Sequence, residues 1–239
     1  MENAVIFEVE NSTAIITLNR PERRNSINQA LLSGLYDSIE KVAKTDDIRV
    51  AVITGNGKSF CSGIDLAVIG KENIFDPRGD GKDMPEIFAS CHKPIIGAIN
   101  GHAITGGFEI ALNCDFLIGS EQAMFADTHA RVGIHPGWGM SQLLQDAVGR
   151  RMAMQMSLTC QFIDAQTALR VGLLNEVVPQ ESLMQRAKEI AAQICGNNRE
   201  MQASVKKLIE YRKGASLEAS LDHEKNEFKK FVKKHMGQA

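Results

Sequence analysis

The sequence predicts an α/β protein in which short strands and helices alternate, followed by a purely helical region. Units of strand, strand and helix recur about four times in the first three quarters of the chain. Their strands are too short, and too often paired in sequence, for a doubly wound sheet. From residue 181 onward only helical periodicity is found, over residues 181–195, 198–212 and 216–235. We therefore expect a core of residues 1–180 and a helical region of residues 181–239.

The chain begins with an expected hairpin of two strands, residues 4–9 and 14–18, joined by a turn at Asn11 and Ser12. A polar connector follows. Asn28 is then expected to cap a helix, because its side chain can accept a hydrogen bond from the first helical turn. Apolar residues at helical spacing support that helix: Leu31, Leu35, Ile39 and Val42.

The middle of the chain carries further strand patterns over residues 49–54, 115–120, 124–126 and 174–178. Helical patterns cover residues 141–148 and 150–158, and Asp164 is expected to cap a short helix that Gly172 ends. Two stretches show no regular pattern, residues 70–91 and residues 129–139. A long irregular loop inside a compact domain is usually functional or mobile, so we expect one of these roles for residues 70–91.

The stretch from Lys93 to Glu109 carries the strongest chemical signal. An apolar strand pattern ends at Asn100-Gly101, and Gly106-Gly107 then precedes an expected helix. Glycine lets the backbone approach a ligand closely, and the first N–H groups of a helix lack internal partners. Such donors beside one carboxylate suit a reaction through an oxyanion or enolate. The alternative is that the glycines permit close packing and that Glu109 complements the helix dipole.

Other site motifs are absent from the sequence. It contains neither Gly-x-Gly-x-x-Gly nor Gly-x-Ser-x-Gly, and Gly107 stands where a phosphate-binding loop would need lysine.

Composition restricts the classes of partner. The 239 residues are 44% apolar and carry a net charge of −2, which gives no reason to expect nucleic acid. The basic residues near the end, Lys229 to Lys234, follow a helical pattern typical of a solvated face. Five cysteines without Cys-x-x-Cys spacing indicate buried thiols in a reducing compartment. Without a leader pattern at Met1-Glu2-Asn3 or a membrane-length apolar run, we expect a cytoplasmic protein.

Four stretches in this order resemble the crotonase superfamily, the enoyl-CoA hydratase/isomerase proteins. The stretches are residues 19–28, residues 60–66, residues 100–115 and residues 125–137. The resemblance covers roughly residues 4 to 180. It implies a spiral of repeated ββα units and a C-terminal helical region that builds homotrimers, or homohexamers made of two trimers. It also implies an acyl-CoA thioester as substrate, with neither a metal nor a redox cofactor.

The resemblance also implies roles for individual residues. The backbone N–H groups of Ile64 and Gly106 would form an oxyanion hole for the thioester oxygen. Glu109 matches the first catalytic glutamate of hydratases, and burial in an apolar cleft would raise its pKa. The remaining matched positions would bind the substrate or CoA: Arg24, Ser62, Gly63, Asp65 and Gly137. Among these, Arg24 would lie near the CoA phosphates and Gly137 near the catalytic water.

The sequence departs from the family pattern at two places. His129 occupies the position of the second hydratase glutamate, and Asp127 or Arg131 could set its tautomer or charge. We expect His129 to act as a catalytic acid, because the adjacent carboxylate of Glu109 stabilises an imidazolium. The residues from Phe228 onward do not clearly match the family's last helix, so a complete CoA pocket is not expected from them.

Three functions remain open on the sequence. The first is an enoyl-CoA hydratase, a lyase that adds water across a 2-enoyl-CoA. The second is another crotonase reaction, either double-bond isomerisation or thioester hydrolysis. The third is a non-catalytic acyl-CoA-binding relative.

Methionines lie on more than one face of the expected helix at residues 150–158: Met152, Met154 and Met156. They suggest a subunit interface or, equally, ordinary core packing.

Overall fold

The computed structural model describes residues 3–237. Met1 and Glu2, on which the expectation about a leader depends, lie outside these described residues. The chain forms two compact units, Met1–Gly196 and Asn197–Ala239. The helices of the first unit are α1 (Gln29–Lys44), α2 (Met84–Ser90), α3 (Gly106–Leu112), α4 (His129–Val132), α5 (Met140–Val148), α6 (Arg150–Thr159), α7 (Ala165–Arg170) and α8 (Leu183–Gly196).

The larger sheet has six strands in the order β1-β2-β3-β5-β7-β10. They are β1 (Val5–Glu10), β2 (Thr13–Leu18), β3 (Val50–Gly55), β5 (Ile95–Ile99), β7 (Phe116–Ser120) and β10 (Glu176–Val178). The predicted hairpin is confirmed, since β1 pairs antiparallel with β2, and every other pairing in this sheet is parallel.

The smaller sheet has four strands in the order β4-β6-β8-β9. They are β4 (Ser59–Cys61), β6 (His102–Ile104), β8 (Met124–Ala126) and β9 (Ile163–Asp164). The strand pairs β3/β4, β5/β6 and β7/β8 each place one strand in the larger sheet and the next in the smaller one. This alternation confirms the spiral of ββα units.

Helices cover both faces of the larger sheet, which explains why its central strands are apolar throughout. On β3, Ala51 and Ile53 belong to the core that α1 closes. Their neighbours Val50 and Val52 pack instead with Leu183 and other residues of α8. Because α8 packs on the sheet, the first compact unit ends at Gly196, beyond the expected boundary at residue 180.

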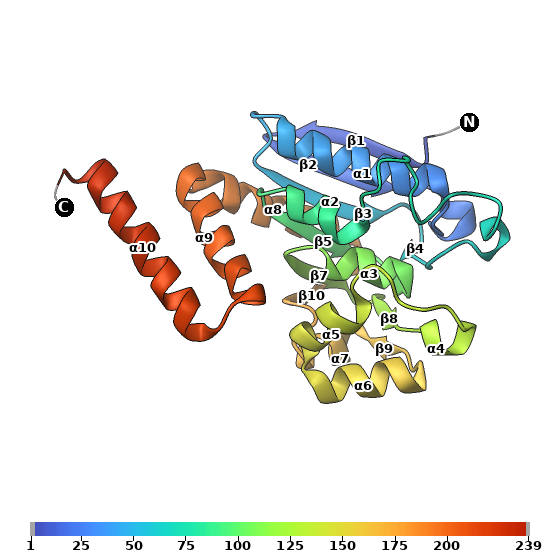
Figure 1. Ribbon diagram of the computed structural model, residues 1–239. Coiled ribbons are helices and arrows are strands. Elements are labelled where there is room, and N and C mark those ends of the chain that lie inside the picture. Colours follow the sequence, from blue (N-terminus) through green and yellow to red (C-terminus); the bar gives the residue numbers. More distant parts are fainter. Residues whose placement is uncertain (1–2, 238–239) are drawn as a thin grey trace. The chain divides into compact units, whose positions relative to one another are not determined.

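The stretch of residues 70–91 is more regular than the sequence suggests. It ends in α2, which packs beside α1 (Figure 1) and begins with a capping box between Asp83 and Glu86. Arg78 holds the preceding loop to α1 by ion pairs with Asp37 and Glu40, at 3.1 and 3.0 Å. Apolar periodicity misses α2 because the helix has only seven residues and contains Pro85.

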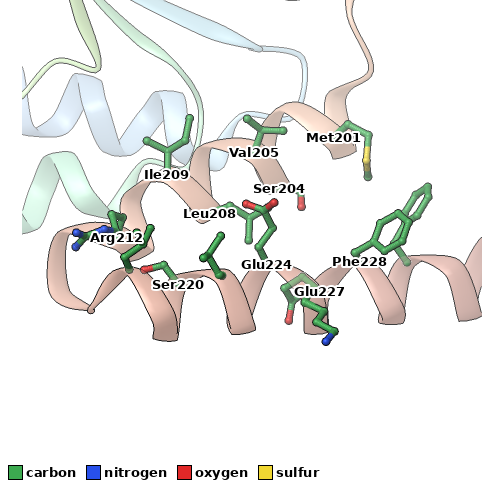
Figure 2. A pocket seen from close by; sticks show the side chains of 14 residues that line it. Met201, Ser204, Val205, Leu208, Ile209, Arg212, Ser220, Glu224, Glu227 and Phe228 are labelled. Atoms are coloured by element: carbon green, nitrogen blue, oxygen red, sulfur yellow. The ribbon is translucent and has the colours of Figure 1, made fainter.

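The second unit contains α9 (Arg199–Tyr211) and α10 (Leu217–His235), as the helical periodicity predicts. An apolar groove of about 750 Å³ lies between these two helices. Figure 2 shows that side chains of both helices line it, among them Val205 and Ile209 from α9 and Phe228 from α10. None of the expected site residues lines this groove.

Candidate active site

Two glycine-containing turns meet where neighbouring strands of the smaller sheet end. β4 and β6 run parallel, so the turns that follow them lie side by side. Gly63 has φ of 91°, and a Cβ placed on it would lie 2.9 Å from the Ile104 carbonyl oxygen and 3.6 Å from Gly106 N. A Cβ on Gly107 would come within 2.1 Å of the Cys61 carbonyl oxygen. Glycine is therefore required at both positions by close backbone contact.

The contact at Gly107 separates the roles of the two adjacent glycines. Gly107 permits close packing, which was the alternative reading of the pair. Gly106 is the first residue of α3, so its N–H has no partner inside that helix. It follows Thr105, a non-glycine residue with φ of 52°, a conformation that is costly and tends to occur at functional sites.

Ile64 supplies a second backbone donor. Ile27 pairs with Ile64 in a parallel bridge. This bridge uses the Gly63 carbonyl and the Asp65 N–H, at 2.8 and 2.9 Å, and leaves the Ile64 N–H on the other side of the chain. Within residues 3–237 neither Ile64 N nor Gly106 N donates a hydrogen bond to a protein acceptor. Neither donor is therefore used by the described part of the chain.

Glu109 lies in the first turn of α3, and its side chain is 2% exposed. Its Oε1 accepts hydrogen bonds from the backbone N–H groups of Trp138 at 2.8 Å and Met140 at 3.2 Å. Burial raises the pKa of Glu109, although these two hydrogen bonds and the His129 ring oppose the rise. The two bonds fix Oε1 and leave Oε2 to face His129.

His129 reaches Glu109 from the neighbouring strand connection. β6 and β8 are parallel with Ile104 opposite Ala126, so the segments that follow them emerge at the same edge of the smaller sheet. His129 Nε2 lies 3.7 Å from Glu109 Oε2, and its side chain is 6% exposed. This separation is longer than a direct hydrogen bond, and it allows one water to contact both atoms.

Asp127 accepts hydrogen bonds from His129. Its Oδ1 lies 2.7 Å from the ring Nδ1 and 3.1 Å from the backbone N of His129. Burial acts to raise the pKa of Asp127, but hydrogen bonds from His129 and Ser157 outweigh it and lower the pKa. Arg131, the other residue expected to influence the ring, donates to the Cys160 carbonyl at 2.8 Å.

A family model described as enoyl-CoA hydratase/isomerase matches residues 8–238. The chain belongs to this family. The match continues through the helical region, further than the resemblance that ends near residue 180. The site described above therefore lies in an enoyl-CoA hydratase/isomerase family member.

Individual relatives agree with this assignment. A protein named "Probable enoyl-CoA hydratase 1, peroxisomal" from Arabidopsis thaliana is 41% identical over 214 residues, 87% of this chain and 79% of its own length. The short-chain-enoyl-CoA hydratase of Clostridium acetobutylicum is 39% identical over 199 residues, 82% of this chain and 76% of its own. The crystal structure of an enoyl-CoA hydratase from Bacillus anthracis is 31% identical, covers 95% of this chain and 90% of its own, and has a TM-score of 0.87.

The expected CoA-binding residues of this family member fall into two groups. Arg24 and Ser62 lie together, because Ser62 N donates to the Arg24 carbonyl at 3.1 Å, and Arg24 is exposed. Gly63 lies in the turn beside Ser62. Asp65 instead accepts from Ala67 N at 3.2 Å and forms a 3.2 Å ion pair with Arg20, so its contacts are structural.

Gly137 is exposed, and a Cβ on it would have no neighbour within 4 Å. Its connection to the site is through the next residue, since Trp138 donates its N–H to Glu109.

The sequence did not reveal the groups that hold Glu109 in this family member. Trp138 and Met140 act through backbone N–H groups, which leave no residue-type signature. Asn113 supports them, since its Nδ2 donates to the carbonyl groups of Trp138 at 2.9 Å and Glu109 at 2.8 Å. Within the described residues, no group of three or more His, Cys, Asp or Glu side chains could hold a metal ion, and no helix is long and apolar enough to cross a membrane.

Proposed function

We infer that this chain is an enoyl-CoA hydratase, a hydro-lyase that adds water across the double bond of a 2-enoyl-CoA. One observation carries the inference: Glu109 and His129 face each other at 3.7 Å beside a segment whose Gly106 N–H is free. Hydration needs one group to take a proton from water and another to deliver a proton to the α-carbon. The sequence relatives that are named enoyl-CoA hydratases support this choice.

The first step is addition of water to the β-carbon. The N–H groups of Ile64 and Gly106 would hold the thioester oxygen as it gains enolate charge, and one such donor is typically worth about 3–4 kcal/mol. Ionised Glu109 takes a proton from water through Oε2 while the water oxygen bonds to the β-carbon. Oε1 stays with Trp138 N and Met140 N, so the base is oriented before the substrate arrives.

The second step is protonation of the α-carbon. Protonated His129 delivers the Nε2 proton as the enolate returns to a thioester. Glu109 then holds one extra proton, and His129 lacks one. Because Oε2 and Nε2 are 3.7 Å apart, one bridging water can carry the proton from Glu109 to His129 and restore both groups. Both groups act from one side of the substrate, which corresponds to syn addition.

Substrate binding remains part of the proposal. Arg24 would contact the CoA phosphates, and Ser62 with Gly63 would lie along the thioester end of CoA. Asp65 would act indirectly, by holding the turn through its ion pair with Arg20.

The reaction needs no metal or redox cofactor, since acyl-CoA is itself the substrate. The five thiols support our expectation of a cytoplasmic location.

The oligomeric state is proposed as a homotrimer or a homohexamer. The groove between α9 and α10 supports it, because Ile209 is 68% exposed and Phe228 is 63% exposed. Apolar side chains gathered on one surface favour burial against a partner. On α6, Met156 is buried and Met154 is exposed, so the methionines divide between core and surface.

Absorbance assays with purified protein test the function. Loss of the ultraviolet absorbance of a conjugated enoyl thioester reports hydration, so a series of 2-enoyl-CoA substrates of increasing length measures both activity and chain-length preference. Conversion of a 3-enoyl-CoA without hydration would support isomerisation instead. Release of free CoA would indicate thioester hydrolysis. Tight CoA binding without any turnover would indicate a non-catalytic relative.

A further inference from the structure

Asp127 is a buried carboxylate for which the proposed proton transfers have no direct use. It is 3% exposed, and it accepts hydrogen bonds from the backbone N–H and the ring Nδ1 of His129. Ser157, on α6, adds a hydrogen bond to Asp127. A buried carboxylate is costly unless it is well hydrogen-bonded. The local contacts therefore dedicate Asp127 to the histidine.

The contact with Asp127 decides which ring nitrogen carries a proton. An ionised carboxylate only accepts hydrogen bonds, so Nδ1 must be the donor in the 2.7 Å contact. Nε2 is then the atom that gains and loses a proton, and it faces Glu109. In the opposite tautomer Nδ1 would present a lone pair to the Asp127 carboxylate, and two acceptors would repel each other.

Charged groups lie next to both nitrogens of the His129 ring. Two carboxyl groups face it, Glu109 from α3 and Asp127 from the segment between β8 and α4. From α6, Ser157 adds a neutral hydroxyl. Arg131 is on the same short helix, but its guanidinium donates to the Cys160 carbonyl. The ring therefore lies between two carboxyl groups, one at each nitrogen.

We propose that Asp127 is a positioning residue that turns His129 into the catalytic acid, by fixing its Nδ1–H tautomer and stabilising the imidazolium. This proposal rests on the proposed hydratase function. It implies that histidine can replace a carboxylic acid here only as a pair with Asp127. It also implies that the contribution of Asp127 depends on His129, because a glutamate at position 129 has no Nδ1–H and no ring tautomer for Asp127 to fix.

The test is a double-mutant cycle of Asp127→Asn and His129→Glu, with hydratase kcat and KM measured from acid to alkaline pH. Asp127→Asn keeps an oxygen acceptor and removes the charge. On its own it should lower kcat by at least about 10-fold with little change in KM, and the decline of kcat at alkaline pH should begin at lower pH. Combined with His129→Glu, the same substitution should lower kcat clearly less than it does in the wild type, because no ring tautomer is left to fix.

The difference between the two backgrounds separates positioning from a structural role. A merely structural Asp127 would be needed equally in both backgrounds, so an equal loss of kcat in both would overturn the proposal. An unshifted pH profile for Asp127→Asn would also overturn it. Asp164→Asn is the matched control. Asp164 lies on β9, opposite Met124 of β8, caps α7 and is exposed, so this variant should keep the wild-type profile.

Nitrogen-15 NMR of the histidine rings in the wild-type protein tests the pair without turnover, with His129→Ala used to assign the signal. In the neutral ring, Nδ1 should carry the proton. A neutral ring protonated at Nε2 would overturn the proposal even if Asp127→Asn fails to fold. If the wild type shows the expected tautomer but hydrates no enoyl-CoA, the function assigned to the site is wrong while the Asp127–His129 contact stands.

Discussion

Glu109 Oε2 and His129 Nε2 lie 3.7 Å apart, and both side chains are almost fully buried. They come from different elements, α3 and α4, that follow neighbouring parallel strands. An acid and a base at this distance can act on one bound water and one carbon without moving. The proposed chemistry therefore depends on the position of each group and on its protonation state.

Glu109→Gln should abolish the base and preserve the site. The amide keeps an oxygen that can accept from Trp138 N and Met140 N, so the fold should be retained. We expect kcat to fall by about 10²–10⁴-fold with a much smaller change in KM. Steady-state kinetics and circular dichroism measure both outcomes. Near wild-type turnover would remove Glu109 from the mechanism.

The same substitution should change how stability depends on pH. The pKa of Glu109 is raised in the folded protein by burial, so the folded state binds the proton more tightly than the unfolded state. The associated stability is present below the unfolded pKa and is lost as pH rises through the folded one. Glu109→Gln removes this loss, so its Tm advantage over wild type should grow from acid to neutral pH.

Thermal unfolding of both proteins across this pH range measures the difference. Glu121→Gln, at an exposed glutamate outside the site, controls for a change of carboxylate to amide. A constant difference in Tm between wild type and Glu109→Gln would contradict the burial effect.

His129→Ala should lower hydratase kcat by at least about 10²-fold, because the α-carbon loses its proton donor. His129→Glu should restore part of the activity, since a carboxylic acid can supply the proton. Wild-type activity in His129→Ala would make the histidine structural.

The proposed oxyanion hole consists of two backbone N–H groups, so the direct test is structural. With an acyl-CoA analogue bound, the thioester oxygen should lie about 2.7–3.1 Å from both Ile64 N and Gly106 N. A thioester oxygen that points away from either donor would contradict the assignment.

Gly63→Ala tests the same hole by mutation. The alanine would adopt φ of 91° with its Cβ 2.9 Å from the Ile104 carbonyl oxygen. We expect a loss of about 1–3 kcal/mol of stability, and reduced kcat because Ile64 N is displaced. Gly196→Ala at the end of α8, where a Cβ meets nothing within 4 Å, is the control for unfolding by denaturant and should show no such loss.

The oligomeric state can be measured directly. Light scattering should give a mass near three or six times the 26.2 kDa of one chain. Ile209→Glu and Phe228→Glu, in the groove between α9 and α10, should reduce that mass, because a charge at an apolar interface is left unpaired. A wild-type monomer would refute the proposal.

The sequence determined those features that depend on neighbouring residues. The first hairpin, the helical region and the caps at Asn28 and Asp164 were all predicted, and both cap side chains accept the expected hydrogen bonds at Leu31 N and Thr167 N. The sequence also showed that Glu109 lies in a helix that begins with two glycines. Turn and cap signals of this kind extend over only a few residues. Weak periodicity in short helices explains why α2 and α4 were missed.

Only the tertiary structure decided how the site is assembled. The Trp138 N–H reaches Glu109 across 29 residues of sequence, and Asp127 rather than Arg131 holds the His129 ring. Gly107 packs against Cys61, while Gly106 keeps a free N–H. These relationships follow from the parallel register of β4, β6 and β8, which brings the segments after each strand to one edge. Local periodicity specifies that a strand exists, but its neighbour and register are set by packing of the whole chain.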